Sequence, residues 1–175
     1  MELLTEPIID PFSHGEHPVM VLQMFNGKKI RIQLEPAAAP ITVAYVMSLV
    51  ESGFYNGTKF HRVIPNFMIQ GGDPTGTGDG ETDYYIKGEF IENGIVNPLP
   101  HLHGAISMAR QDGCDTASCQ FFIMLATNPG LDGHYAVFGN VIEGLEAIDQ
   151  IGTVPTNEAD APIKPIIIRR AYLET

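Results

Sequence analysis

The side chains best suited to chemistry lie in one short stretch of the sequence, Lys59–Gly76. Arg62 stands between Phe60 and Ile64 in a segment that alternates like a β-strand, so we expect these three side chains to share one face. The turn that follows leads to an aromatic, a thioether and an amide side chain, which are Phe67, Met68 and Gln70. A guanidinium held beside such groups describes a pocket for an apolar ligand that carries one polar atom. The alternative is that Arg62 pairs with a carboxylate and its apolar neighbours form ordinary core, since buried arginines are usually paired.

A second alternating segment, Gln120–Leu125, supplies further candidate side chains. Gln120, Phe122 and Met124 fall on one face of this segment, and the opposite face is wholly apolar. We expect the apolar face to pack in the core, which leaves Gln120 and Phe122 facing a cleft.

The length and charge of the chain limit the classes of protein to which it can belong. We expect one domain over residues 1–175, in which the turn-rich segment 1–17 is an N-terminal arm and residues 18–173 form a barrel. The formal net charge of −11, with only 10 Lys and Arg residues, argues against a nucleic-acid partner, because phosphates require a basic stripe. No apolar run is long enough for a membrane span, and the acidic N-terminus lacks the features of a signal peptide. The expected location is therefore cytoplasmic, with no membrane partner.

Cysteine and histidine residues predict no cofactor site. Cys114 and Cys119 are spaced like neither a redox pair nor a zinc knuckle, so we expect free thiols, with a regulatory disulfide as the alternative. His101 and His103 would share a strand face, which permits a metal pair, yet no further ligand lies near them in the sequence. The glycine-rich segment 71–80 matches neither a Walker loop nor a dinucleotide fingerprint. We expect no cofactor and no metal.

Periodicity and turn residues predict many strands and two helices. Asn26-Gly27 between two alternating runs predicts a hairpin over residues 19–34. Apolar residues recurring every three or four positions from Pro40 predict an amphipathic helix that ends at Gly53. Other predicted elements are a short strand near Tyr84, strands at 101–110, 120–125 and 135–138, a helix at 144–151 and a buried last strand at 165–172. This pattern indicates a mainly β fold, namely a closed antiparallel barrel with two capping helices, because closure removes exposed sheet edges.

Several motifs, in this order, resemble the cyclophilin family of peptidyl-prolyl cis-trans isomerases. They are FHRVIP at 60–65, Phe67-Met68, QGGD at 70–73, SCQFFI at 118–123, LDG at 131–133 and VFG at 137–139. The resemblance covers about Val19 to Tyr172, and bacterial single-domain members are similar. It implies an eight-stranded antiparallel barrel closed by two helices, with the active cleft on the outer face of the sheet.

The resemblance also implies roles for individual residues. Arg62 matches the catalytic arginine of the family, and Gln70 matches the amide that orients it. The residues implied to contact the substrate proline are Phe60, Phe67, Met68, Phe122, Leu131 and Tyr135. Those that match the groove for the preceding residue are Ala109, Arg110 and Gln120.

Three positions depart from the best-known eukaryotic members. Gly130 stands where they have tryptophan, which implies weakened binding of cyclosporin. Tyr135 replaces a histidine, as in bacterial members, and still offers a ring and a hydroxyl group to the pocket. Cys119 replaces a serine of similar size.

The implied activity is rotation about X-Pro bonds in proline-containing peptides and flexible protein segments, which assists protein folding. We expect the chain to act as a monomer. A first rival is a binding module that holds a proline-containing loop without turnover; a second is a redox or metal protein built on the cysteines and histidines. The joint presence of Arg62, Phe67, Gln70 and Phe122 favours the enzyme, because binding modules of this type often lose the arginine or the pocket.

Overall fold

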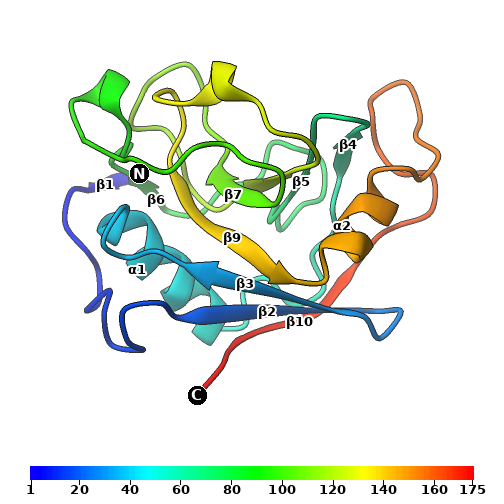
Figure 1. The fold of residues 1–175 in the computed structure, drawn as a ribbon, viewed down its shortest axis with the longest axis horizontal. Helices are drawn as coiled ribbons and strands as arrows, with labels where there is room; N and C mark the ends of the chain where they lie inside the picture. Colours follow the sequence, from blue (N-terminus) through cyan, green and yellow to red (C-terminus); the bar gives the residue numbers. More distant parts are fainter.

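A computed structural model describes residues 1–175 of the protein. Two helices are present, α1 (Pro40–Glu51) and α2 (Leu145–Ile151), and they lie on opposite sides of the view in Figure 1. The strands are β1 (Glu2–Leu4), β2 (Val19–Met24), β3 (Lys29–Leu34), β4 (Arg62–Ile64), β5 (Met68–Gly71), β6 (Tyr84–Ile86), β7 (Ala105–Met108), β8 (Phe121–Met124), β9 (Val137–Glu143) and β10 (Ile168–Leu173). Two short 3-10 helices occupy loops at Ile91–Asn93 and Pro129–Leu131. Neither α-helix has the length and apolar content needed to cross a bilayer.

Eight strands form one antiparallel sheet in the order β10-β2-β3-β9-β7-β8-β5-β4, which confirms the predicted mainly β architecture. The predicted closure is incomplete, because the edge strands β4 and β10 do not pair with each other. Main-chain hydrogen bonds next to these strands bridge the gap instead: Phe60 N donates to Ile166 O at 2.9 Å, and Ile168 N donates to Thr58 O at 2.8 Å. These main-chain bonds satisfy part of the exposed edges without a further strand.

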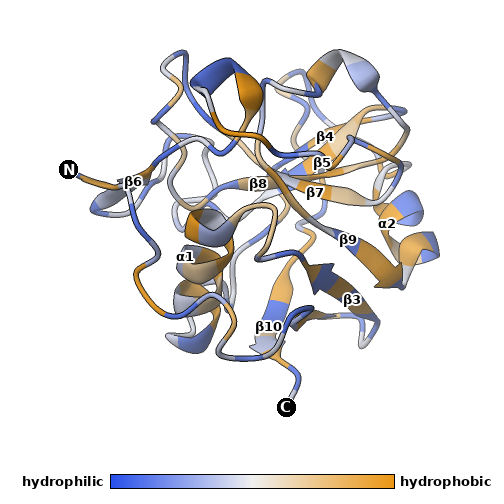
Figure 2. Cartoon of the chain, turned by 60° about the vertical axis from the view of Figure 1, so that its left-hand side comes forward, coloured by the Kyte–Doolittle hydropathy of each residue, from blue (hydrophilic) through white to orange (hydrophobic).

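The register of the strands sorts apolar side chains onto the two faces of the sheet. Val63, Ile69 and Ile123 face the interior of the barrel and belong to the larger buried cluster. Met68 and Phe122 point the opposite way and belong to a smaller buried cluster outside the barrel. Figure 2 shows hydrophobic stretches on strands such as β4 and β9 and hydrophilic residues along many loops. The alternation predicted for residues 120–125 is confirmed, and the smaller cluster provides a floor on the outer face.

Helix α1 begins at Pro40, as predicted, but a residue distant in the sequence caps it. Glu89 is 2% exposed and accepts hydrogen bonds from Ile41 N at 3.2 Å and from both Thr42 N and Thr42 Oγ1 at 2.7 Å. The residue that precedes the helix, Ala39, provides no side-chain cap. A carboxylate at this end satisfies N–H groups that have no partner within the helix and interacts favourably with the helix dipole.

The same helix is buried almost all round, whereas the sequence predicted one apolar face. Nine of its twelve residues are buried. The N-terminal arm passes beside it in Figure 1. His14 Nε2 of the arm lies 3.1 Å from Glu51 Oε1 at the end of the helix. Strand β1 of the arm pairs in parallel with β6. The arm therefore packs against the rest of the chain.

Candidate active site

Three side chains that the sequence analysis singled out lie in one row across neighbouring strands. Arg62 of β4 is paired with Gln70 of β5, and Gln70 is paired with Phe122 of β8. Directly opposed residues point to the same face of a sheet, so all three side chains lie on the outer face. A slip of one residue in this register would turn the row into the barrel interior. The pairing of β4, β5 and β8 is thus what assembles the site.

A cavity of about 220 Å³ opens on this row of side chains. Six of its nine lining residues are hydrophobic, which suits a small apolar ring. The lining residues are Arg62, Phe67, Met68, Gln70, Ala109, Arg110, Phe122, Leu131 and Tyr135. The structure therefore brings together nine of the eleven residues predicted to act in catalysis or substrate binding.

The guanidinium of Arg62 is exposed at the cavity and makes no ion pair. Its hydrogen bond runs from Nη1 to Gln70 Oε1 over 3.4 Å. Gln70 Nε2 in turn donates to Gln120 Oε1 at 2.9 Å. The alternative in which Arg62 is neutralised by a buried carboxylate is therefore wrong, and most of its N–H donors are free to meet a ligand.

Residues 19–173 match the family model described as cyclophilin-type peptidyl-prolyl cis-trans isomerase. The chain belongs to the cyclophilin family. A peptidyl-prolyl cis-trans isomerase of Schizosaccharomyces pombe is 43% identical over 143 residues, which are 82% of this chain and 91% of the relative. The mouse protein named peptidyl-prolyl cis-trans isomerase-like 1 is 42% identical over 134 residues, or 77% of this chain and 80% of the relative.

Solved structures agree with this membership. The crystal structure of a Cryptosporidium parvum cyclophilin-type isomerase superposes on this chain with a TM-score of 0.84 and a sequence identity of 30%. The superposed region covers 91% of this chain and 98% of the Cryptosporidium chain. The same enzyme was also crystallised in the presence of the dipeptide Ala-Pro, with a TM-score of 0.82. The cyclophilin formed by residues 1–175 therefore has peptidyl-prolyl cis-trans isomerase activity. Proteins of the family bind proline-containing peptides.

One predicted substrate contact of the cyclophilin site is wrong. Phe60 is fully buried in the main core, where its ring meets that of Phe121 edge to face at a centroid distance of 6.0 Å. Strand β4 begins only at Arg62, so the alternation that placed Phe60 and Arg62 on one face does not extend back to Phe60. A side chain without exposed surface makes no contact with a peptide. Phe60 instead packs against Gly71, the last residue of β5, since a Cβ at Gly71 would lie 2.9 Å from its ring.

Gln120 lies beside the apolar cavity rather than in its wall. It lines a polar cavity of about 260 Å³ that shares Gln70, Ala109 and Arg110 with the apolar one. The two cavities therefore form a continuous cleft, and the amide of Gln70 stands at the boundary between them. A peptide longer than a dipeptide can extend from one into the other.

The guanidinium of Arg110 is committed to the protein itself. It donates to the backbone oxygens of His134 at 2.9 Å and Gln111 at 3.0 Å and lies 3.3 Å from Glu92 Oε2. It also lies 5.0 Å from the ring centroid of Tyr135, a cation–π distance. Arg110 thus forms a rigid wall of the cleft and holds Tyr135 in place.

A histidine beneath the pocket has a role that the sequence did not predict. His101 is 1% exposed and stacks on Phe122 with a centroid distance of 5.9 Å and an interplanar angle of 10°. Its Nδ1 lies 2.9 Å from Asp132 Oδ1 and its Nε2 lies 3.0 Å from Ser107 Oγ. Burial lowers the pKa of His101 below its usual value, although Asp132 acts in the opposite direction. No local motif reveals this role, because Asp132 is 31 residues away in the sequence.

The cysteines and the pair His101 and His103 do not form the redox or metal site that was considered as an alternative. His103 Nε2 lies 2.7 Å from Asp149 Oδ1, so His101 and His103 have separate partners and do not form the metal pair considered above. Cys114 and Cys119 are both free thiols. Burial raises the pKa of Cys119 to about 12, which keeps this thiol protonated and unreactive.

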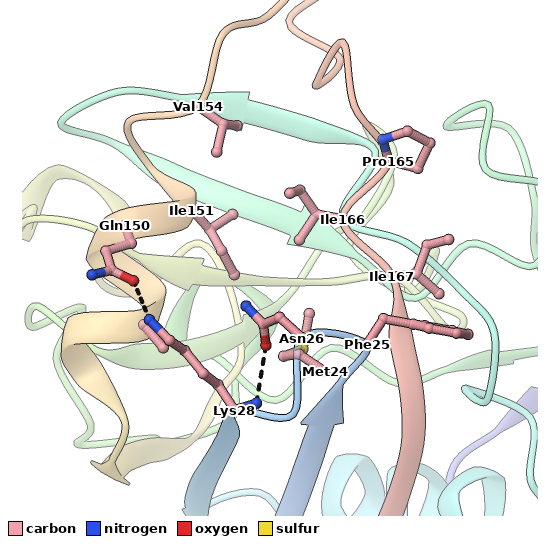
Figure 3. A pocket seen from close by; sticks show the side chains of 11 residues that line it. Met24, Phe25, Asn26, Lys28, Gln150, Ile151, Val154, Pro165, Ile166 and Ile167 are labelled. Atoms are coloured by element: carbon pink, nitrogen blue, oxygen red, sulfur yellow. Dashed lines mark hydrogen bonds between the residues drawn. The ribbon is translucent and has the colours of Figure 1, made fainter.

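A larger cavity, of about 370 Å³, lies between the β2–β3 hairpin, α2 and the segment before β10. Figure 3 shows Ile151 and Ile166 at this cavity, together with the hydrogen bond of 2.5 Å from Lys28 Nζ to Gln150 Oε1. The cavity shares no lining residue with the cleft at Arg62, and its one cationic side chain is bonded to the protein. Size therefore does not identify the active site; the unpaired guanidinium does.

Proposed function

We propose that Arg62 accelerates isomerisation by donating a hydrogen bond to the nitrogen of the substrate proline while its peptide bond is twisted. In the planar bond the nitrogen lone pair is delocalised, and rotation about this bond has to overcome a barrier of about 18–20 kcal/mol. At the twisted transition state the nitrogen regains its lone pair and becomes a better acceptor. A donor aimed at that nitrogen binds the transition state more tightly than either planar isomer.

The observation that carries the proposal is a guanidinium without an ion pair beside an apolar cavity of about 220 Å³. As an arginine, Arg62 presents rigid, planar donors. Gln70 Oε1 accepts one of its hydrogen bonds, which supports a fixed orientation. The aromatic and aliphatic side chains around it would hold the proline ring, and these are Phe67, Met68, Phe122, Leu131 and Tyr135.

The magnitudes require more than one interaction. Raising a rate of about 0.01 per second to roughly 1000 per second lowers the barrier by about 7 kcal/mol. One charge-assisted hydrogen bond contributes about 1.5–3 kcal/mol. Orientation of the ring and exclusion of water from the cavity must supply the remainder. Ala109, Arg110 and Gln120 are proposed to hold the residue before proline while its carbonyl group swings.

The proposed substrates are X-Pro bonds in flexible or unfolded protein segments, whose isomerisation assists folding. We propose further that the enzyme acts as a monomer in the cytoplasm. Cyclosporin should bind weakly, because Gly130 offers no ring where well-known members have tryptophan. The two free thiols support a location in a reducing compartment. The acidic net charge argues against a nucleic-acid partner.

Replacement of Arg62 tests the proposal. Arg62→Ala should lower kcat/KM for an Ala-Pro peptide roughly 10- to 150-fold in a protease-coupled assay, the loss of one charge-assisted hydrogen bond. Arg62→Lys should recover little, because a lysine cannot reproduce the planar donor pair. Arg169→Ala is the matched control, since Arg169 is an exposed arginine outside the cleft. Unchanged activity of Arg62→Ala would refute the assigned role, and peptide binding without turnover by the wild type would favour a binding module.

A further inference from the structure

Behind the cleft, a buried carboxylate organises the loop formed by residues 74–80. Asp73 is 1% exposed and accepts hydrogen bonds through Oδ1 from Thr75 N at 2.7 Å and Thr75 Oγ1 at 2.8 Å. Through Oδ2 it accepts from Gly78 N at 2.5 Å and Gly80 N at 3.1 Å. Burial alone would raise the pKa of Asp73, but these bonds outweigh it and hold the pKa at about 2. The side chain therefore stays ionised, and both of its oxygens are committed to the loop.

Glycine at position 80 is required for this arrangement. A Cβ atom there would lie 1.8 Å from Asp73 Oδ1 and 2.7 Å from Asp73 Cγ, far inside contact distance. Gly78 has a φ of +99°, a conformation that side chains disfavour. The loop thus wraps the carboxylate so closely that no other residue fits at Gly80.

The carbonyl groups of the same loop reach the cleft. Gln120 Nε2 donates to Gly78 O and to Gly80 O, in both cases at 2.9 Å. Backbone oxygens only accept, so the amide group of Gln120 has one allowed orientation, with Nε2 toward the loop and Oε1 away from it. That Oε1 accepts from Gln70 Nε2 at 2.9 Å.

The orientation of Gln70 follows from this contact. Because its Nε2 is used by Gln120, its Oε1 faces Arg62 Nη1. With both amides reversed, Gln70 would present N–H donors to the guanidinium, and the two groups would repel. The loop carbonyls therefore decide whether Gln70 attracts or repels Arg62.

We propose that Asp73 is a positioning residue for prolyl isomerisation, acting on Arg62 through the loop carbonyls, Gln120 and Gln70. Asp73 does not touch the substrate. It fixes where the carbonyl groups of Gly78 and Gly80 lie, and this sets the direction of every hydrogen bond between the loop and the guanidinium. The inference rests on the proposed role of Arg62 as the donor to the proline nitrogen.

The test replaces Oδ2 of Asp73 with a donor. In Asp73→Asn one amide oxygen still accepts from Thr75, while the NH₂ group faces the N–H groups of Gly78 and Gly80 and displaces the loop. We expect kcat for an Ala-Pro peptide to fall roughly 3- to 30-fold, which lies within the range of coupling between residues in one hydrogen-bond network. KM should change less than about twofold, because the apolar walls are untouched. Asp83→Asn is the control, because it makes the same chemical change at an exposed position near the loop. Its kcat and KM should match those of the wild type.

A double-mutant cycle separates positioning from general stability. If Asp73 acts through Gln120, Asp73→Asn should add no further loss of kcat in a Gln120→Leu background. Additive losses overturn the proposal, as does an unchanged kcat of Asp73→Asn measured well below its melting temperature. Should Asp73→Asn fail to fold, Gln120→Leu is measured by itself. Its side chain can neither donate to the loop carbonyls nor accept from Gln70 Nε2, so Gln70 should lose its orientation and the NMR resonance of Arg62 Nε should shift. An unmoved resonance refutes the connection.

The two proposals fail in distinguishable ways. If Arg62→Ala retains full activity, the role of Arg62 is wrong. If Arg62→Ala loses activity while Asp73→Asn and Gln120→Leu keep the Arg62 resonance of the wild type and Asp73→Asn keeps its kcat, only the positioning role of Asp73 is wrong.

Discussion

His101 and Phe122 lie in an offset stack beneath the cavity, and their contact shows how single residues set the geometry of this enzyme. The imidazole is held from both sides, by Asp132 at Nδ1 and by Ser107 at Nε2. It stacks on the ring that forms the floor of the cleft, while Tyr135 meets that ring edge to face at 5.5 Å. Each aromatic contact fixes the next, so the walls are rigid before a substrate arrives.

The buried position of His101 predicts a dependence of stability on pH. Its pKa in the folded state lies below the unfolded value of about 6.5, so its contribution to the free energy of unfolding is present above pH 6.5 and is lost as the pH falls through the lowered pKa. NMR titration of the ring C–H resonances should give a midpoint below about 6.5. Urea unfolding of the wild type and His101→Asn should show a smaller loss of stability for the variant between pH 7 and pH 5. A midpoint above 6.5 would contradict the prediction.

Among the elements, helix α1 depends on a cap that its own sequence does not supply. The sequence predicts the start at Pro40 and the end near Gly53 correctly, because proline and glycine act through local backbone geometry. It does not predict Glu89, which is 47 positions away from Thr42. Strand limits also shifted for tertiary reasons: β9 runs from Val137 to Glu143 to pair with β3 and β7, and β10 begins at Ile168.

Removal of this cap should destabilise the fold without touching the cleft. Glu89→Ala leaves the N–H groups of Ile41 and Thr42 buried without an acceptor, which should lower the free energy of unfolding by about 1–3 kcal/mol. Glu89→Gln retains one acceptor oxygen and should cost less. Chemical denaturation measures both variants, and kcat should equal that of the wild type at temperatures where both are folded. Equal stability of Glu89→Ala and wild type would show that the cap is dispensable.

In the molecule as a whole, one sheet separates two apolar clusters that have different roles. The interior cluster stabilises the barrel, and the outer cluster around Met68 and Phe122 supports the cleft. Of the two clusters, the arm packs only against the interior one, through residues such as Leu4, while β1 pairs with β6. The gap between β4 and β10 is bridged by the main-chain hydrogen bonds that join residues 58–60 to residues 166–168.

Deletion of residues 1–5 should therefore affect stability and not catalysis. It removes the β1–β6 pairing and the contact of Leu4, at a cost of roughly 1 kcal/mol, which should lower the melting temperature by about 2–4 °C. Calorimetry measures the change, and kcat/KM for an Ala-Pro peptide should stay within the error of the wild type. A large loss of activity would mean that the arm contributes to the cleft.

The sequence by itself determined the local features: the hairpin at Asn26-Gly27, the start of α1 at Pro40, and the alternation that turns Phe122 outward and Ile123 inward. Together with the family motifs, these placed Arg62, Gln70 and the apolar walls in one cleft. Only the tertiary structure decided that Phe60 belongs to the core, that Glu89 caps α1, that His101 supports Phe122 and that Gln120 directs Gln70. The physical reason is that each of these contacts joins residues distant in the sequence, and their geometry depends on strand register and loop closure, which no local pattern encodes.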